Sequence, residues 1–120
     1  MKLPLKFRGA DMSASTRTDW VKLPAQAKRC AIDLGWPATG TPIGTLSIEL
    51  SNDSNAATGA AYPIAIATNP TGGAGSILLD NIQTSARFLA VVYAVTSGGV
   101  GAAFTGMGGA GTAPTVEIKE

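Results

Sequence analysis

The sequence predicts an all-β fold, a β-sandwich or jelly roll of about eight short antiparallel strands that follows an extended N-terminal arm. In residues 44–51, Leu46, Ile48 and Leu50 alternate with polar residues, as in a strand with one buried face. Residues 87–96 are apolar on both faces and rich in Val, Phe and Tyr, as in a strand covered from both sides, and we expect the two stretches to pair. The 15 glycines and 7 prolines are scattered, which suits short strands and tight turns rather than long helices.

Composition and length indicate one folded domain. The chain has 120 residues, of which 45% are hydrophobic and 14% charged, so it can bury a core without disulfides or metals. Residues 1–18 contain a short extended piece and then a small, polar stretch without periodicity, which we interpret as a basic arm. Residues 19–120 form the predicted sandwich domain.

The elements before the central strand follow from alternation and from proline. Residues 19–24 alternate briefly and stop at Pro24, which predicts an edge strand or the first residues of a sheet. Residues 25–28 form a helical turn or a loop. The next strand carries its large apolar residues on one face, namely Cys30, Ile32, Leu34 and Trp36.

The elements after the central strand are short strands separated by turns. Residues 51–54 favour a turn because their short polar side chains bond their own backbone, and residues 55–61 form a small-residue loop. Residues 62–67 predict an edge strand, since Pro63 interrupts the run. The remaining predicted elements are a strand at 76–80, a connection at 81–85, a turn at 96–99, a returning strand at 100–105, a glycine-rich loop at 106–112 and a closing strand at 115–119.

A charge-free stretch offers an alternative to part of this assignment. Residues 88–116 contain no charged residue and are long enough for a membrane helix. Glycines and the Thr96-Ser97 pair interrupt the stretch, and β-branched and aromatic residues dominate its first half. A β-hairpin around residues 96–99 explains the same residues, so we expect no membrane contact.

Charge is balanced at +1 overall but is unevenly spread. Residues 1–29 carry seven Lys or Arg and two Asp, a net charge of +5, whereas residues 30–120 carry two basic and six acidic residues, a net charge of −4. A basic arm on a mildly acidic body could contact an acidic partner, a neighbouring copy or nucleic acid. The charges are spaced rather than clustered, so a simple solvated surface is the alternative.

Enzymatic chemistry is not indicated. The chain has no histidine, which excludes Ser-His-Asp and Cys-His nucleophile systems and His-containing zinc sites. Cys30 is the only cysteine, and its place on an alternating strand predicts a buried, inert thiol. Residues 106–111 match a GxGxxG pattern, but no helix follows to receive a pyrophosphate. We therefore expect no enzyme, no cofactor and no metal.

Five residues could serve as contacts on loops. Asn52, Asp53 and Asn55 carry oxygen atoms that could bind Ca²⁺, but only one of them is charged and the same residues favour a turn. Trp20 and Tyr62 could add aromatic surface for a sugar or a receptor.

The order of several short motifs resembles that of a known family. Over residues 28–120 the chain has Gly44-Thr45-Leu46 leading to Ser51-Asn52-Asp53, then Leu78-Leu79-Asp80, then Arg87-Phe88-Leu89-Ala90-Val91-Val92-Tyr93, and then Thr96-Ser97-Gly98-Gly99-Val100-Gly101. This succession resembles the small β-sandwich virion structural proteins of tailed bacteriophages.

The resemblance implies a non-enzymatic capsid cement or decoration protein. Such a protein binds the major capsid protein on the outside of the shell as a homo-oligomer, a dimer or a trimer, and requires neither nucleic acid nor a membrane. It would be made in the host cytoplasm and reside in the virion, and the N-terminus agrees because it lacks the apolar core of a signal peptide. Expected partner-binding residues on the arm are Lys2, Lys6, Phe7, Arg8 and Arg17.

A second function class stays open. The chain could be a carbohydrate- or receptor-binding module of a phage tail or surface protein, using Trp20, Tyr62 and the loop at residues 52–55. A single-strand nucleic-acid binder is disfavoured, because the chain has few aromatic residues for stacking and an acidic body.

Overall fold

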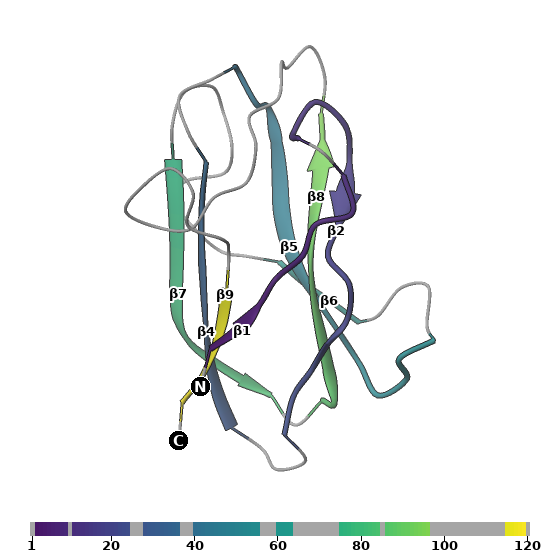
Figure 1. Ribbon diagram of the computed structural model, residues 1–120, viewed down its shortest axis with the longest axis vertical. Coiled ribbons are helices and arrows are strands. Elements are labelled where there is room, and N and C mark those ends of the chain that lie inside the picture. Colours follow the sequence, from purple (N-terminus) through teal and green to yellow (C-terminus); the bar gives the residue numbers. More distant parts are fainter. Residues whose placement is uncertain are drawn as a thin grey trace.

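The computed structural model describes residues 2–9, 11–24, 28–36, 40–55, 60–63, 75–84, 86–96 and 115–119. These residues form nine strands in two antiparallel sheets and no helix (Figure 1). The prediction of an all-β fold is confirmed. Within the same ranges there is no helix long and apolar enough to cross a membrane.

The first sheet has the strand order β1-β9-β4-β7. Its longest ladder joins β4 (Lys28–Trp36) to β7 (Gly75–Thr84), and β4 also pairs with β9 (Thr115–Lys119), to which β1 (Lys2–Pro4) is added. The closing strand predicted at residues 115–119 is confirmed.

The strand predicted to end at residue 80 continues to residue 84. Two residues of β7, Asp80 and Asn81, lie opposite the single residue Ala31 of β4, which makes a β-bulge. The polar pair that was interpreted as the end of a strand is therefore an irregularity within it. Pairing resumes beyond the bulge, because β4 extends far enough to provide partners.

The second sheet is built on β8 (Phe88–Val95). On one side β8 pairs with β5 (Gly44–Ser51) through eight residue pairs, from Gly44 opposite Val95 to Ser51 opposite Phe88. The expected pairing of these two stretches is confirmed. On its other side β8 pairs with two short strands, β2 (Thr16–Arg17) and β3 (Val21–Lys22), and β6 (Ala60–Pro63) pairs with β5.

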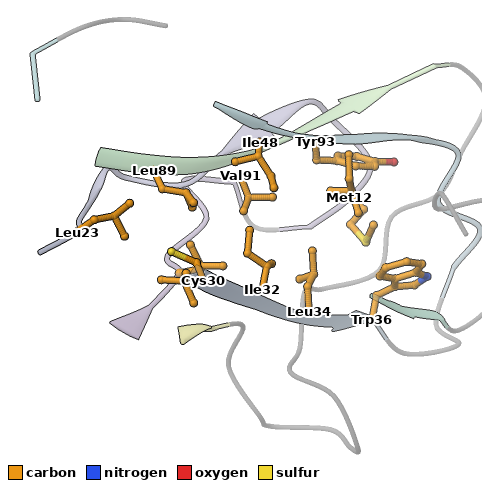
Figure 2. Packing of buried hydrophobic residues seen from close by; sticks show 13 residues of the cluster. Met12, Leu23, Cys30, Ile32, Leu34, Trp36, Ile48, Leu89, Val91 and Tyr93 are labelled. Atoms are coloured by element: carbon orange, nitrogen blue, oxygen red, sulfur yellow. The ribbon is translucent and has the colours of Figure 1, made fainter. Parts of the chain in front are cut away.

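The two sheets share one hydrophobic core. The four residues predicted on one face of β4 are all buried, and Cys30 is a reduced thiol with no exposed surface. Figure 2 shows this row facing side chains of β5 and β8. Members of the core from the two sheets and the segments beside them are Leu5, Met12, Leu23, Cys30, Ile32, Leu34, Trp36, Leu46, Ile48, Leu89, Val91, Tyr93 and Val116.

The N-terminal residues differ from the expected extended arm. After β1 the chain crosses from the first sheet to the second (Figure 1), and Phe7 bridges to Thr18 in an antiparallel hairpin. Leu5 is 3% exposed and Met12 is fully buried, so this segment supplies part of the core. The prediction of an arm free to reach a neighbour is wrong for the described residues. Because the residues around Met12 are polar and without periodicity, its burial could not be predicted from the sequence.

A tight turn directs Met12 inward. The Asp11 carboxylate accepts hydrogen bonds from the backbone N–H of Ser13 at 2.9 Å and from its hydroxyl at 2.5 Å, and these bonds lower the pKa of Asp11 below its ordinary value. In Figure 2 the Met12 side chain lies beside Tyr93 and near Trp36, at one end of the core. The Ser15 hydroxyl then accepts the Val95 N–H at 3.0 Å, which attaches the turn to the end of β8.

Two predicted edges are confirmed, and several predicted elements lie outside the described residues. β3 and β6 are both at edges of the second sheet, as proline had indicated. β6 begins at Ala60 rather than at residue 62, because Ala60 and Ala61 pair with Leu50 and Glu49. Of the helical turn or loop predicted at residues 25–28, the structure describes only Lys28, which begins β4. Residues 64–67, 97–105 and 106–112 of other predicted elements also lie outside the described residues.

Tyr93 occupies a tight site in the core. Its side chain has no exposed surface. A Cβ atom on Gly44 would lie 2.6 Å from the Tyr93 ring and 2.5 Å from the Ala94 carbonyl oxygen, so glycine is required where β5 begins. Burial raises the pKa of the Tyr93 hydroxyl above its ordinary value of 10.0, because the ionised form would lose its hydration.

We expect Met12→Ala to lower the free energy of unfolding by about 2–5 kcal/mol, because it removes a fully buried side chain and leaves a cavity. Ala14→Ser changes an exposed residue of the same turn and should shift it by less than about 0.5 kcal/mol. Urea unfolding followed by tryptophan fluorescence measures both. If both substitutions changed the free energy of unfolding equally and only slightly, residues 1–18 would not contribute to the core.

We expect stability to fall as the pH rises above about 10. In the unfolded chain Tyr93 ionises at its ordinary value of 10.0, whereas in the folded protein its pKa is higher. The contribution of Tyr93 to stability is therefore complete below its pKa in the unfolded chain. It is lost as the pH rises through its pKa in the folded protein. Urea unfolding of wild type and Tyr93→Phe between about pH 8 and about pH 11 tests this. The difference in stability between the two proteins should change across that range, and parallel profiles would contradict the prediction.

Candidate functional site

An extra residue in the edge of the second sheet brings two predicted contact residues together. Arg17 lies opposite Val92 and Val21 lies opposite Leu89, so three residues of the edge face two residues of β8. This β-bulge changes which side chains share a face. Strict alternation would place Arg17 and Trp20 on opposite faces, but the bulge places both on the face away from the core.

Thr18 holds the bulge against β8. Its backbone N–H donates to the Val91 carbonyl at 2.9 Å, and its hydroxyl oxygen accepts the Val91 N–H at 2.9 Å. The hydroxyl thus takes the place of a backbone carbonyl in the ladder. Thr18 is only 1% exposed, and this pair of bonds satisfies the backbone groups of Val91 where the regular register is interrupted.

Arg17, Trp20 and Glu49 form a cluster on the outer face of the second sheet, which we call the Arg17 cluster. Arg17 Nη2 lies 3.2 Å from Glu49 Oε1, and Arg17 Cζ lies 5.2 Å from the centre of the Trp20 ring. The cluster thus links the edge strand to β5 across β8. Ala90 lies opposite Glu49, on the outer face of the sheet, because it alternates with core-facing residues of β8. It is nevertheless fully buried, as expected if the cluster covers it.

The interactions within the Arg17 cluster hold the N-terminal edge strand against the second sheet. The Arg17 and Glu49 side chains are only 17% and 11% exposed, so little water competes with their ion pair. The guanidinium also meets the π face of Trp20, a further favourable contact for a cation. Arg17 and Trp20, which the sequence predicted as contacts for two different partners, hold the edge of the sheet in place together.

The other predicted arm residues are divided between the two sheets. Lys2 lies in β1 opposite Glu117, and Lys6 is exposed. Phe7 is half-buried against the core. The Arg8 N–H donates to the Arg17 carbonyl at 3.0 Å, and Arg8 Nε lies 2.9 Å from the Asp19 carboxylate in an exposed ion pair.

Three of the five predicted loop contacts, Asn52, Asp53 and Asn55, lie in a closed turn after β5. Asn52 Oδ1 accepts the Arg87 N–H at 3.1 Å, and Asp53 Oδ1 accepts the Asn55 N–H at 2.9 Å. The Ser51 hydroxyl accepts the Asp53 N–H and donates to the Asp53 carbonyl, both at 2.9 Å. The turn predicted at residues 51–54 is confirmed, and Asn52 links it to the start of β8.

The structure does not gather the loop candidates into one site. Trp20 lies beside the middle of β8, whereas the turn at residues 52–55 lies beyond its first residue. Tyr62 pairs with Ile48 in the β5–β6 ladder. Among the described residues, no group of three or more His, Cys, Asp or Glu could hold a metal ion.

Two members of these arrangements escaped the sequence-based interpretation. Glu49 was expected only as a polar residue on the outer face of a strand, and Thr18 as part of a polar arm. The pairing of distant segments gives each its role: 32 residues separate Arg17 from Glu49, and 73 separate Thr18 from Val91. A local pattern carries no signal for such contacts.

Comparison with known proteins found no family model, curated protein or solved structure that matches this chain. We therefore argue its function from its own strand order, contacts and charges.

We expect the Arg17–Glu49 pair to matter more for stability than the exposed Arg8–Asp19 pair. Arg17→Met leaves the largely buried Glu49 carboxylate without its guanidinium and should lower the free energy of unfolding by about 1–3 kcal/mol. Arg8→Met, the control, affects a pair whose side chains are 56% and 61% exposed and should cost no more than about 1 kcal/mol.

A double-mutant cycle completes this test. Adding Glu49→Gln to Arg17→Met should recover part of the loss, because it removes the unpaired charge. Urea unfolding of the four proteins gives the coupling free energy. A coupling free energy below about 0.5 kcal/mol, within the range of exposed ion pairs, would contradict the anchoring role of the cluster.

Proposed function

We propose that this protein is a jelly-roll β-sandwich that serves as a non-enzymatic virion structural protein, of the capsid cement or decoration type. The observation that carries the proposal is the order in which the strands pair. The resemblance of the strand motifs to small phage β-sandwich proteins supports it independently.

The pairing is nested, as in a long hairpin that has rolled up. The first strand pairs with the last, β1 with β9, and β4 and β5 pair with β7 and β6. If β2 and β3 count as one interrupted edge strand, they form the remaining pair with β8. Counted in this way, the strands take eight positions, four in each sheet, and this order supports the proposed jelly roll made of two Greek keys.

Jelly rolls are common in viral capsid and lectin domains, so the topology favours both function classes that the sequence left open. The motifs that resemble those of phage proteins help to choose between these two function classes. Gly44 to Asp53 and Arg87 to Tyr93 coincide with β5, its turn and β8, the inner pair of the second sheet. The resemblance therefore concerns the framework of the fold, which favours the virion structural role.

The described polar groups also suit a structural role. The thiol of Cys30 is fully buried and cannot reach a substrate. The Arg17 cluster and the turn at residues 52–55 use their charged and polar atoms to hold strands and turns. What the fold offers a partner is surface complementarity, for which a specific contact needs on the order of 800 Å² on each side.

The proposal names the major capsid protein as the partner and a dimer or trimer of this chain as the binding unit. Oligomers of this kind are usually symmetric and would match the repeating lattice of a shell. The protein would be made in the host cytoplasm and carried in the virion.

Co-sedimentation of the purified full-length chain with phage shells that lack it tests this function. We expect saturable binding at a fixed ratio to the major capsid protein, with the chain alone remaining in the supernatant. Circular dichroism first establishes that the chain is folded. Deletion of residues 1–18 is unsuitable as a control, because it removes the core side chains Leu5 and Met12.

The alternative is a carbohydrate- or receptor-binding module, for which a glycan screen with the same protein is the matched experiment. A folded chain that binds no shell but binds a defined glycan would reject the cement function and favour the module.

A further inference from the structure

The fold gathers most of the basic residues at one end of the molecule. In the first sheet, β4 begins with Lys28 and Arg29, and Arg29 lies opposite Lys119 near the end of β9. Lys2 lies at the start of β1, opposite Glu117. The register therefore places four basic positions at the same end of this sheet.

The second sheet adds two more basic positions at the same end of the molecule. Lys22 lies in β3 opposite Phe88, the first residue of β8, and Arg87 immediately precedes β8. Leu23 N–H donates to the Arg87 carbonyl at 2.7 Å, which places the two segments side by side. Only residues 23–27 join β3 to β4 and only 85–87 join β7 to β8, so both sheets present these positions at one end. Figure 1 shows both chain termini at the same end.

This basic end is defined by Lys2, Lys22, Lys28, Arg29, Arg87 and Lys119, six of the nine Lys and Arg residues. Asp53, Asp80 and Glu117 are the acidic residues that the described part of the chain places there, since Asp80 and Glu117 lie on either side of Ala31 in β4. The other three cations, Lys6, Arg8 and Arg17, lie elsewhere, with the other four described acidic residues, and Arg8 and Arg17 are in ion pairs. The sequence showed that residues 1–29 are basic, and the fold brings four of these basic residues together with Arg87 and Lys119 at one end.

The exposed positions make this charge available to a partner. Lys22 and Arg87 are both exposed. The backbone groups of Arg87 are engaged with Asn52 and Leu23, so its position is held while its side chain lies at the surface. Cations on a rigid framework lose less entropy on binding than cations on a flexible arm.

The composition of this end favours a protein partner over a nucleic acid. Asp53, Asp80 and Glu117 interrupt the basic positions, and half-buried Phe88 and exposed Pro24 lie beside this end. A phosphate backbone is bound best by an unbroken basic track, whereas mixed charge around an aromatic residue is typical of a protein interface with complementary potential.

We propose that the basic end is the surface that docks on an acidic patch of the partner protein. This step rests on the function proposed above, in which the partner is the shell protein. It assigns the contact to one end of the fold instead of to an N-terminal arm.

Charge reversal separates the basic end from general electrostatic attraction. Lys22→Glu and Arg87→Glu each place a negative charge at the basic end, and each should weaken shell binding at least about tenfold, because like charges then face each other. Lys6→Glu is the matched control: it changes the net charge equally at an exposed position, and the Lys6 carbonyl accepts a backbone bond from Asp19, away from that end. It should change binding less than about twofold.

Circular dichroism and urea unfolding confirm that each variant is folded. Binding of wild type should also weaken as salt is raised, because the Debye length falls to about 10 Å at 0.1 M and shorter above it. If the wild type binds shells and the two basic-end variants bind equally well, or if Lys6→Glu is as harmful, the docking surface is rejected while the cement function stands.

A second measurement does not depend on the shell. Titration of the ¹⁵N-labelled chain with poly-glutamate, monitored by amide chemical shifts, should perturb residues of the basic end and leave Lys6 and Arg8 unchanged. If the shifts are confined to the basic end but the chain does not bind shells, the cement function is rejected and the basic end is supported as a docking surface. Absent or scattered shifts would overturn the surface, as would tighter binding to double-stranded DNA than to poly-glutamate at the same salt.

Discussion

The second sheet depends on β8, which is paired on both sides along its length. Eight residue pairs join it to β5, and the N-terminal edge covers its other side. With its backbone groups satisfied in both directions, β8 can bury Leu89, Val91 and Tyr93 against the row on β4 without leaving polar groups unpaired. The turn after β5 is attached to it through Asn52.

The N-terminal segment makes this arrangement possible because it contributes to both sheets. β1 extends the first sheet, and the segment then crosses to form the edge of the second, with Met12 inserted between the layers. An edge strand left uncovered presents unpaired backbone groups to other chains, and this segment covers one edge of each sheet. The Thr18 bonds and the Arg17 cluster fasten it where its register shifts.

This use of the N-terminal charges determines what is left for a partner. Arg17 is engaged with Glu49 and Trp20, and Arg8 with Asp19, so the cations of the hairpin are occupied within the molecule. The remaining basic residues are concentrated at the end where β3 meets β4 and β7 meets β8. A pair of antiparallel sheets with one basic end is suited to oriented docking, because charge complementarity fixes the direction from which a partner approaches.

The sequence by itself determined the all-β class, the pairing of residues 44–51 with 87–96, the buried face of β4 and the turn at 51–54. Each is set by alternation or by short polar side chains, which act between near neighbours. Only the tertiary structure decided that Met12 is buried, that β7 continues through a bulge at Asp80 and Asn81, and that Arg17 meets Glu49. These features depend on contacts between segments far apart in the chain, and a one-residue shift of register changes which side chains share a face. The basic end has the same origin, because antiparallel pairing brings both termini and two connections to one place.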